Sequence, residues 1–126
     1  MRNVRVLIVD DEKLLCRVMR DFLQEKGLSM DIAFTGGEGL DLLLKRSFDA
    51  VIVDHRLTDM TGNDFILKAH KIMPGMKFII YTGMPDYRVT DDLKDIGMNE
   101  DSFLLKPVFD LNILYNKILE KLMIKN

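Results

Sequence analysis

Acidic side chains directly follow two apolar stretches of this sequence. Residues 50–53 are too few for a helix and apolar throughout, which is typical of a buried strand in a parallel sheet, and Asp54 comes next. Asp10 and Asp11 follow a second apolar, β-branched stretch, residues 4–9. A carboxylate is costly to desolvate, and the functional sites of open α/β sheets lie beyond the carboxyl ends of their strands. Asp54 is therefore the first candidate for chemistry.

Two more predicted strands end in polar residues of another kind. Residues 77–81 lead into Thr82, and residues 102–105 lead into Lys106. If all strands run the same way, a hydroxyl and an ammonium group join the carboxylates at one edge of the sheet. Gathered carboxylates repel one another unless a cation lies among them, and oxygen ligands without Cys or His favour Mg²⁺ or Mn²⁺ over zinc. This set suits phosphoryl transfer to Asp54 as nucleophile.

Helical patterns alternate with the strands that must position these residues. Gly27 is placed to end the first helix, and Thr35 and Glu38 have the spacing of a capping box for the second. Asp86 and Asp110 are suitable N-caps for the fourth and fifth helices. The alternation predicts an α/β fold with a parallel sheet covered on both faces. The five expected strands are residues 4–9, 28–34, 50–53, 77–81 and 102–105.

Length and composition restrict the class of protein. The 126 residues suffice for one domain, with 48% hydrophobic and 30% charged residues, as in globular proteins. A net charge of -2 gives no reason to expect direct contact with nucleic acid. The single cysteine, Cys16, is expected in the core, which fits a reducing compartment. Without a signal-peptide pattern or an apolar run of membrane-spanning length, we expect a cytoplasmic protein that does not contact membranes.

Four motifs, in order, make the chain resemble the response-regulator receiver domain of two-component signalling. The resemblance covers residues 3–123, so we expect a single receiver domain over residues 1–126. It implies a flavodoxin-like, doubly wound (βα)5 fold with strand order 2-1-3-4-5, for which the chemotaxis receiver is a known example. The four motifs are Val9-Asp10-Asp11-Glu12, Val53-Asp54 with Gly62, Thr82-Gly83, and Lys106-Pro107.

The resemblance also implies how the acceptor site works. Asp54 would be the phosphoacceptor, taking a phosphoryl group from the phosphohistidine of a sensor histidine kinase or phosphotransfer protein. Asp11 and Asp54 would bind Mg²⁺ directly with the backbone carbonyl of Arg56, and Asp10 would contribute through water. Lys106 would pair with Asp54 and later with a phosphoryl oxygen. The chain would catalyse only its own phosphorylation and dephosphorylation, as a signalling module rather than an enzyme.

A second set of implied roles concerns signal output. Thr82 would turn toward the phosphoryl group, and Phe103 would move inward with it. The Lys106-Pro107 bond is expected to be cis. The surface formed by the fourth helix, fifth strand and fifth helix would then act on an output domain or downstream protein, or form a homodimer. Phe103 is equally consistent with partly buried core, because its position in a motif does not establish mobility.

The chain departs from the family pattern at positions beside the acceptor. Arg56, two residues after Asp54, places a large cation there, and Met84 stands two residues after Thr82. We hypothesise that Arg56 modulates metal affinity and self-hydrolysis, and that Met84 shields the phosphoaspartate from water. His55 is a neighbour of the acceptor, and strand alternation turns such a neighbour away, so a surface role is expected.

Three alternatives remain open from the sequence. Asp10 and Asp11 are also consistent with a simple helix N-cap. A Mg²⁺-dependent phosphohydrolase could use the same aspartyl phosphate, but it would require a second carboxylate two residues after the nucleophile, where Arg56 stands. A non-phosphorylated pseudo-receiver could serve as an interaction module, which the complete acceptor set argues against.

Overall fold

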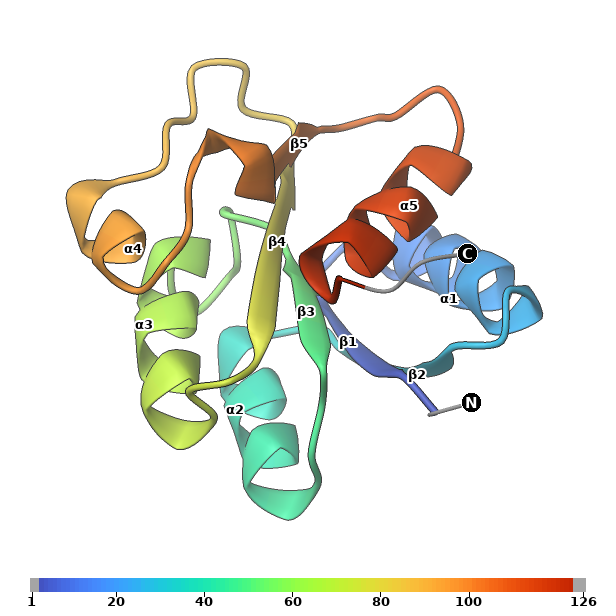
Figure 1. The fold of residues 1–126 in the computed structure, drawn as a ribbon, viewed down its shortest axis with the longest axis horizontal. Coiled ribbons are helices and arrows are strands. Elements are labelled where there is room, and N and C mark those ends of the chain that lie inside the picture. Colours follow the sequence, from blue (N-terminus) through green and yellow to red (C-terminus); the bar gives the residue numbers. More distant parts are fainter. Residues whose placement is uncertain (1–2, 124–126) are drawn as a thin grey trace.

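Five strands alternate with helices in the computed structural model, which describes residues 3–123 (Figure 1). The predicted α/β class is confirmed. Within the described range, no helix combines the length and the apolar character needed to cross a membrane. The elements are β1 (Arg5–Val9), α1 (Lys13–Glu25), β2 (Ser29–Ala33), α2 (Gly36–Lys45), β3 (Ala50–Val53), α3 (Gly62–Ile72), β4 (Lys77–Thr82), α4 (Asp91–Asp95), the 3₁₀ turn η1 (Glu100–Ser102), β5 (Phe103–Leu105) and α5 (Asn112–Lys121).

All strand pairs are parallel, and the strand order is β2-β1-β3-β4-β5. The order implied by the resemblance is therefore confirmed. β3 lies in the centre, where Val53 is paired with Val9 of β1 and with Ile80 of β4. All four residues of β3 are buried, as expected for a strand with both faces covered.

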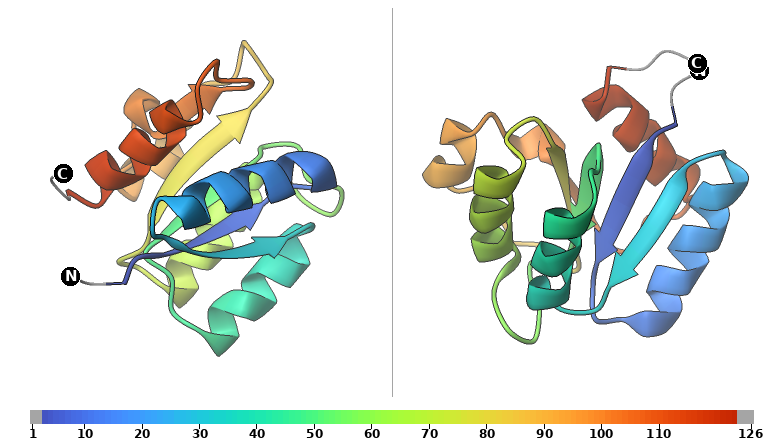
Figure 2. Two further views of the ribbon diagram at one scale, coloured as in Figure 1. Left: turned by 90° about the vertical axis from the view of Figure 1, so that its right-hand side faces the viewer. Right: turned by 90° about the horizontal axis from the view of Figure 1, so that it is seen from below.

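Two helical layers cover the sheet, and each takes alternate side chains of the strands (Figures 1 and 2). Val51 and Val53 point into a core shared with α2, α3 and α4. Ala50 and Ile52 point into a second core shared with α1 and α5. Cys16 of α1 is fully buried in this second core, so its predicted core position is confirmed.

The fourth helix begins later than predicted. α4 starts at Asp91, preceded by Thr90, rather than after Asp86. Tyr87 and Val89 are buried while the residue between them is exposed, and this alternation favours extended backbone over a helix, which is not formed here. The Asp86 cap prediction was therefore wrong.

The final strand and helix are also shorter than predicted. β5 begins at Phe103, because η1 precedes it. α5 begins at Asn112, and Leu111 rather than Asp110 is the residue immediately before it. The Asp110 carboxylate nevertheless accepts a 2.9 Å hydrogen bond from the N–H of Asn112, so it still satisfies one backbone donor at the start of α5.

Candidate functional site

The hydrogen bonding of the sheet continues one residue beyond its strands. The N–H of Asp54 donates to the carbonyl of Val9 at 3.1 Å, and the N–H of Lys106 donates to the carbonyl of Thr82 at 2.9 Å. The backbone at each of these positions is thus fixed by the register of the sheet. The strand ends meet at one edge, as predicted for parallel strands.

The ammonium group of Lys106 lies among three carboxylates at this edge. Its Nζ is 2.8 Å from Asp10 and 3.0 Å from Asp54, and it also contacts Glu12. The side chains of Lys106 and Asp54 are each 10% exposed and that of Asp10 is 3% exposed. The Lys106–Asp10 and Lys106–Asp54 ion pairs are therefore largely buried away from water. The Lys106–Pro107 peptide bond is cis.

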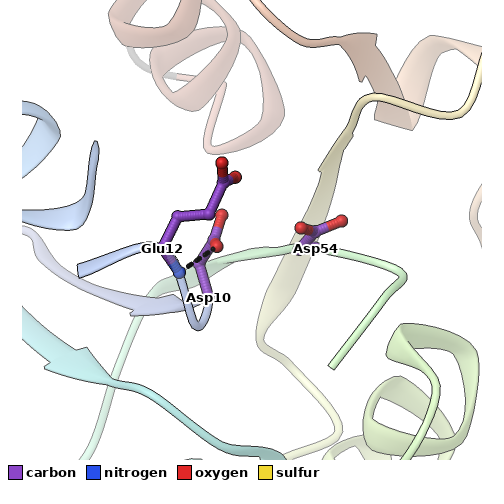
Figure 3. Close-up of side chains that lie close together, drawn as sticks. All are labelled: Asp10, Glu12 and Asp54. Carbon is purple, nitrogen blue, oxygen red and sulfur yellow. Dashed lines mark hydrogen bonds between the residues drawn. The ribbon is translucent and has the colours of Figure 1, made fainter. Parts of the chain in front are cut away.

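Three carboxylates are close enough to hold a metal ion together (Figure 3). Oxygen atoms of Asp10, Glu12 and Asp54 all lie within 4.8 Å of one another. Oxygen-only donors fit Mg²⁺ or Mn²⁺, which prefer such ligands. The predicted metal residues Asp10 and Asp54 are therefore together, whereas Asp11 is exposed and lies outside this cluster.

Glu12 is the residue of this cluster that sequence reasoning did not select. The Asp10 carboxylate accepts a 3.0 Å hydrogen bond from the N–H of Glu12, which forms a local turn between β1 and α1. The turn brings the side chains of residues 10 and 12 to the same side (Figure 3). The acidic triple that begins at Asp10 was the only sequence signal for this arrangement.

Burial and ion pairing shift the pKa in opposite directions at both Asp10 and Lys106. Burial raises the pKa of Asp10 above its ordinary value, although hydrogen bonds from Lys106 and from the N–H of Glu12 lower it in part. Burial lowers the pKa of Lys106, but hydrogen bonds to Asp10 and Glu12 outweigh this effect and raise that pKa overall. Lys106 is therefore an ammonium ion throughout the neutral pH range.

A cavity of about 500 Å³ opens over Asp54. Thr82 and Lys106 line it, and Thr82 is only 1% exposed. Among the residues that the structure describes, the Thr82 hydroxyl has no hydrogen-bond partner. A buried hydroxyl without a partner costs free energy, so a movement of Thr82 that brought its hydroxyl to an oxygen in the cavity would recover part of that cost.

The two residues that depart from the family pattern also line this cavity. Arg56 is exposed, and its guanidinium forms no ion pair within residues 3–123. Its backbone N–H donates a 3.3 Å hydrogen bond to the Asp54 carboxylate, so the chain just after Asp54 also orients that carboxylate. Met84 is half-buried and packs on the edge of the core next to the cavity.

A row of three rings extends from the loop that follows β3 to β5. The ring of His55 lies 5.0 Å from that of Tyr87, which lies 5.2 Å from that of Phe103. His55 is only partly exposed and its Nδ1 is buried, so the expectation of a simple surface role was wrong. Tyr87, which sequence reasoning did not select, is 5% exposed, and burial raises its pKa to about 12. Phe103 is half-buried against Tyr87.

Comparisons with a family, with solved structures and with curated proteins all point to the family that the four sequence motifs resemble. Residues 6–119 match the family described as the response regulator receiver domain. A solved CheY-like receiver domain protein from Methanospirillum hungatei superimposes with a TM-score of 0.81 at 32% identity, covering 97% of this chain and 95% of that one. The response regulator TrrA from Thermotoga maritima, solved in complex with Mg²⁺-BeF, gives 0.80 at 28% identity, covering 94% and 98%.

Curated relatives are longer proteins that contain a similar segment. The transcriptional regulatory protein GlrR of Escherichia coli is 34% identical over 117 residues, which are 93% of this chain and 26% of that protein. CusR of Escherichia coli is 30% identical over 106 residues, which are 82% of this chain and 45% of that protein. The chain thus spans about a quarter to a half of the length of these relatives.

Proposed function

Because the chain belongs to the response regulator receiver domain family, we propose that it is a phosphoacceptor switch in which Asp54 takes a phosphoryl group from a phosphohistidine. One observation carries this proposal. The ammonium group of Lys106 pairs with Asp54 at a cavity that Thr82 also lines, and the buried Thr82 hydroxyl has no hydrogen-bond partner among the described residues. A nucleophile, a cation and a hydrogen-bond donor are thereby gathered where a phosphoryl group can enter.

The transfer step requires only positioning and charge neutralisation. A carboxylate oxygen of Asp54 attacks phosphorus while the phosphorus–nitrogen bond of the donor breaks, and that electron pair returns to the imidazole ring of the donor. No base is needed, because the attacking group is a carboxylate oxygen, and Lys106 Nζ contacts that carboxylate at 3.0 Å. Lys106 then offsets the charge of the transferred phosphoryl oxygens.

The proposed cofactor is Mg²⁺, with Mn²⁺ as a substitute. Asp10 and Asp54 belong both to the observed acidic cluster and to the ligand set implied by the resemblance. We assign the remaining ligands to Asp11 and the backbone carbonyl of Arg56. When bound, the metal would supply positive charge to the phosphoryl oxygens.

The proposed output follows from the position of Thr82 on β4. A hydrogen bond from its hydroxyl to the phosphoryl group would move the end of β4 and the loop that follows it. Phe103 would respond, because β5 pairs with β4 and its Phe103 is partnered with Ile80. The α4-β5-α5 surface would then control an output domain or a downstream protein, or mediate a homodimer. The donor would be a sensor histidine kinase or a phosphotransfer protein.

Arg56 and Met84 are proposed modulators of the phosphorylated state. Arg56 has no ion-pair partner among the described residues and borders the acceptor cavity, so its guanidinium is available to an anion bound there. We expect Arg56→Asn to change both Mg²⁺ affinity and the rate of self-hydrolysis. If neither quantity changed, Arg56 would have no modulating role.

Phosphorylation by acetyl phosphate and Mg²⁺ tests the proposed function. Intact mass spectrometry should show one added phosphoryl group, absent without Mg²⁺ and absent in Asp54→Asn. Asp64→Asn is the matched control, since Asp64 is an exposed carboxylate on α3, and this variant should label normally. Absence of label on the wild-type chain would refute the proposal. Sustained turnover of a small phosphate ester would instead indicate a phosphohydrolase.

A further inference from the structure

The carboxylate of Asp59 joins the loop after the acceptor to the start of α2. Its Oδ1 accepts a 2.9 Å hydrogen bond from the N–H of Gly36, and its Oδ2 accepts a 2.9 Å hydrogen bond from the N–H of Gly37. These are the first two residues of α2, whose N–H groups have no partner within the helix. Asp59 therefore binds the start of α2 from the loop that connects β3 to α3.

The remaining donors of this helix end are satisfied locally. Thr35 accepts from the N–H of Glu38 through its hydroxyl, at 3.1 Å, and from the N–H of Gly39 through its carbonyl, also at 3.1 Å. The N-cap at Thr35 is thus confirmed, whereas the described residues show no reciprocal bond from the Thr35 N–H to the Glu38 side chain, which would complete the predicted capping box. The Thr35 cap leaves Gly36 and Gly37 without partners of their own, and Asp59 supplies both. The positive end of the helix dipole favours a carboxylate at this place.

Close packing accompanies these hydrogen bonds. A Cβ atom on Gly36 would lie 2.5 Å from Sδ of Met60, and one on Gly37 would lie 3.3 Å from Oδ2 of Asp59. A larger residue at position 36 would displace the Met60 side chain from α2. The two glycines therefore allow the loop of Asp59 and Met60 to lie directly against the helix.

The other end of the same loop is rigidly attached to the acceptor. The N–H of Gly62 donates to the carbonyl of His55 at 2.7 Å, and Arg56 and Thr61 form an antiparallel bridge. A Cβ atom on Gly62 would lie only 2.5 Å from the carbonyl oxygen of Asp54. The loop is consequently a compact unit, and a displacement of Asp59 would be transmitted to Arg56.

We propose that Asp59 is a positioning residue of the acceptor site: by holding the 55–61 loop on α2, it fixes the backbone of Arg56 beside Asp54. This inference rests on the proposed function, since it assigns that site a residue which contacts neither substrate nor metal. It adds α2, which is absent from the proposed output surface, to the elements that determine the geometry of phosphoryl transfer. The hydrogen bonds that Asp59 accepts from the N–H groups of Gly37 and Gly36 lower its pKa, so the carboxylate stays ionised at neutral pH.

The first test measures amide hydrogen exchange by NMR in the metal-free protein. Asp59→Ala should accelerate exchange about 10-fold or more at Gly36 and Gly37, and also at Arg56, because the loop is released along its length. Asp59→Asn retains one acceptor oxygen and should fall between Asp59→Ala and wild type. Asp64→Ala removes a nearby exposed carboxylate without touching α2 and should leave all three amides unchanged. Acceleration confined to the two glycines would overturn the proposal.

The second test measures Mg²⁺ affinity by calorimetry with the same variants. We expect Asp59→Ala to weaken binding about 10-fold, a usual effect of losing a residue that orients metal ligands. Wild-type affinity in Asp59→Ala would overturn the positioning role even if exchange at Gly36 were faster. Failure of the wild-type chain to bind Mg²⁺ would instead refute the metal-dependent function, and the exchange at Arg56 would still decide whether Asp59 holds the loop.

Discussion

The N–H of Lys106 donates a 2.9 Å hydrogen bond to the carbonyl of Thr82, which places the two side chains proposed to contact a phosphoryl group on adjoining backbone. The two side chains nevertheless differ in how many polar partners they have in the unphosphorylated protein. Lys106 has three carboxylate partners, whereas the Thr82 hydroxyl has none within the described chain. Within the described chain, the proposed acceptor site therefore has a cation with carboxylate partners and a hydroxyl donor without a partner.

Thr82→Val should make the unphosphorylated protein more stable. The substitution keeps the shape of the side chain and removes a buried hydroxyl that has no partner, so the free energy of unfolding should rise by about 1 kcal/mol. Chemical denaturation measures this change. Thr61→Val is the matched control and should lower the same quantity by about 1 kcal/mol, because the Thr61 hydroxyl caps α3 by accepting from Asp64. Destabilisation by Thr82→Val would show that the hydroxyl is satisfied in solution.

Thr82→Val should also separate phosphoryl binding from output. Beryllofluoride with Mg²⁺ should still bind near Asp54, but the NMR shifts that it causes in β5 and α4 should be much smaller than in wild type. Equal shifts in the two proteins would show that the Thr82 hydroxyl does not transmit the signal.

Asp10→Asn should stabilise the fold and weaken the metal site. Burial raises the pKa of Asp10, so its ionised form costs stability above that pKa, and the cost disappears as pH falls through it. We expect the thermal midpoint of Asp10→Asn to exceed that of wild type by a few degrees at pH 7, and the difference to shrink in acid. Asp11→Asn, a change at an exposed carboxylate, should leave the midpoint unchanged. A lower midpoint for Asp10→Asn would mean that its ion pair with Lys106 outweighs its burial.

The third carboxylate of the proposed metal site can be identified with a matched pair of variants. Glu12 is already paired with Lys106, whereas Asp11 is exposed and makes no ion pair within the described residues. We expect Asp11→Asn to weaken Mg²⁺ binding by about 10-fold or more and Glu12→Gln to weaken it less, as measured by calorimetry. The reverse order would place the metal within the observed cluster of Asp10, Glu12 and Asp54.

Met84→Ala should shorten the lifetime of the phosphoaspartate. Met84 is half-buried at the cavity over Asp54, and its removal would admit water to the phosphoryl group. We expect the decay rate of the labelled protein to rise by about threefold, equivalent to less than 1 kcal/mol in the barrier. Decay followed by mass spectrometry measures this rate, and equal rates in variant and wild type would exclude the shielding role.

The sequence was most informative where a residue's position depends on a strand. Asp54 and Lys106 could be placed because each follows a short apolar run, and parallel strands bring such positions to one edge. Glu12 and Asp59 act through turns, and nothing in their local pattern shows that Glu12 contacts Lys106 or that Asp59 accepts from the N–H groups of α2. Tyr87 was missed for a related reason, because the segment before α4 was predicted to be helical and is extended.

The contact between η1 and α5 makes an acid-dependent contribution to stability. The Asp101 carboxylate lies 2.7 Å from Nζ of Lys117 and 3.1 Å from Nζ of Lys121, and these hydrogen bonds lower its pKa below the ordinary 3.8. The stability that it adds is therefore present above about pH 4 and is lost as pH falls further. Because the Asp101 side chain is 53% exposed, solvent screens the pairs, and the contribution is less than about 1 kcal/mol.

Asp101→Asn should accordingly lower the free energy of unfolding at pH 7 by a few tenths of a kcal/mol, and by less in high salt. Denaturation at a series of pH values should show the difference from wild type shrinking below pH 4. Asp95→Asn is the matched control, because Asp95 is an exposed carboxylate of α4 without an ion pair in the described part of the chain, and it should have no effect. If Asp101→Asn matched wild type at every pH, the lysines of α5 would add nothing to the attachment of this helix.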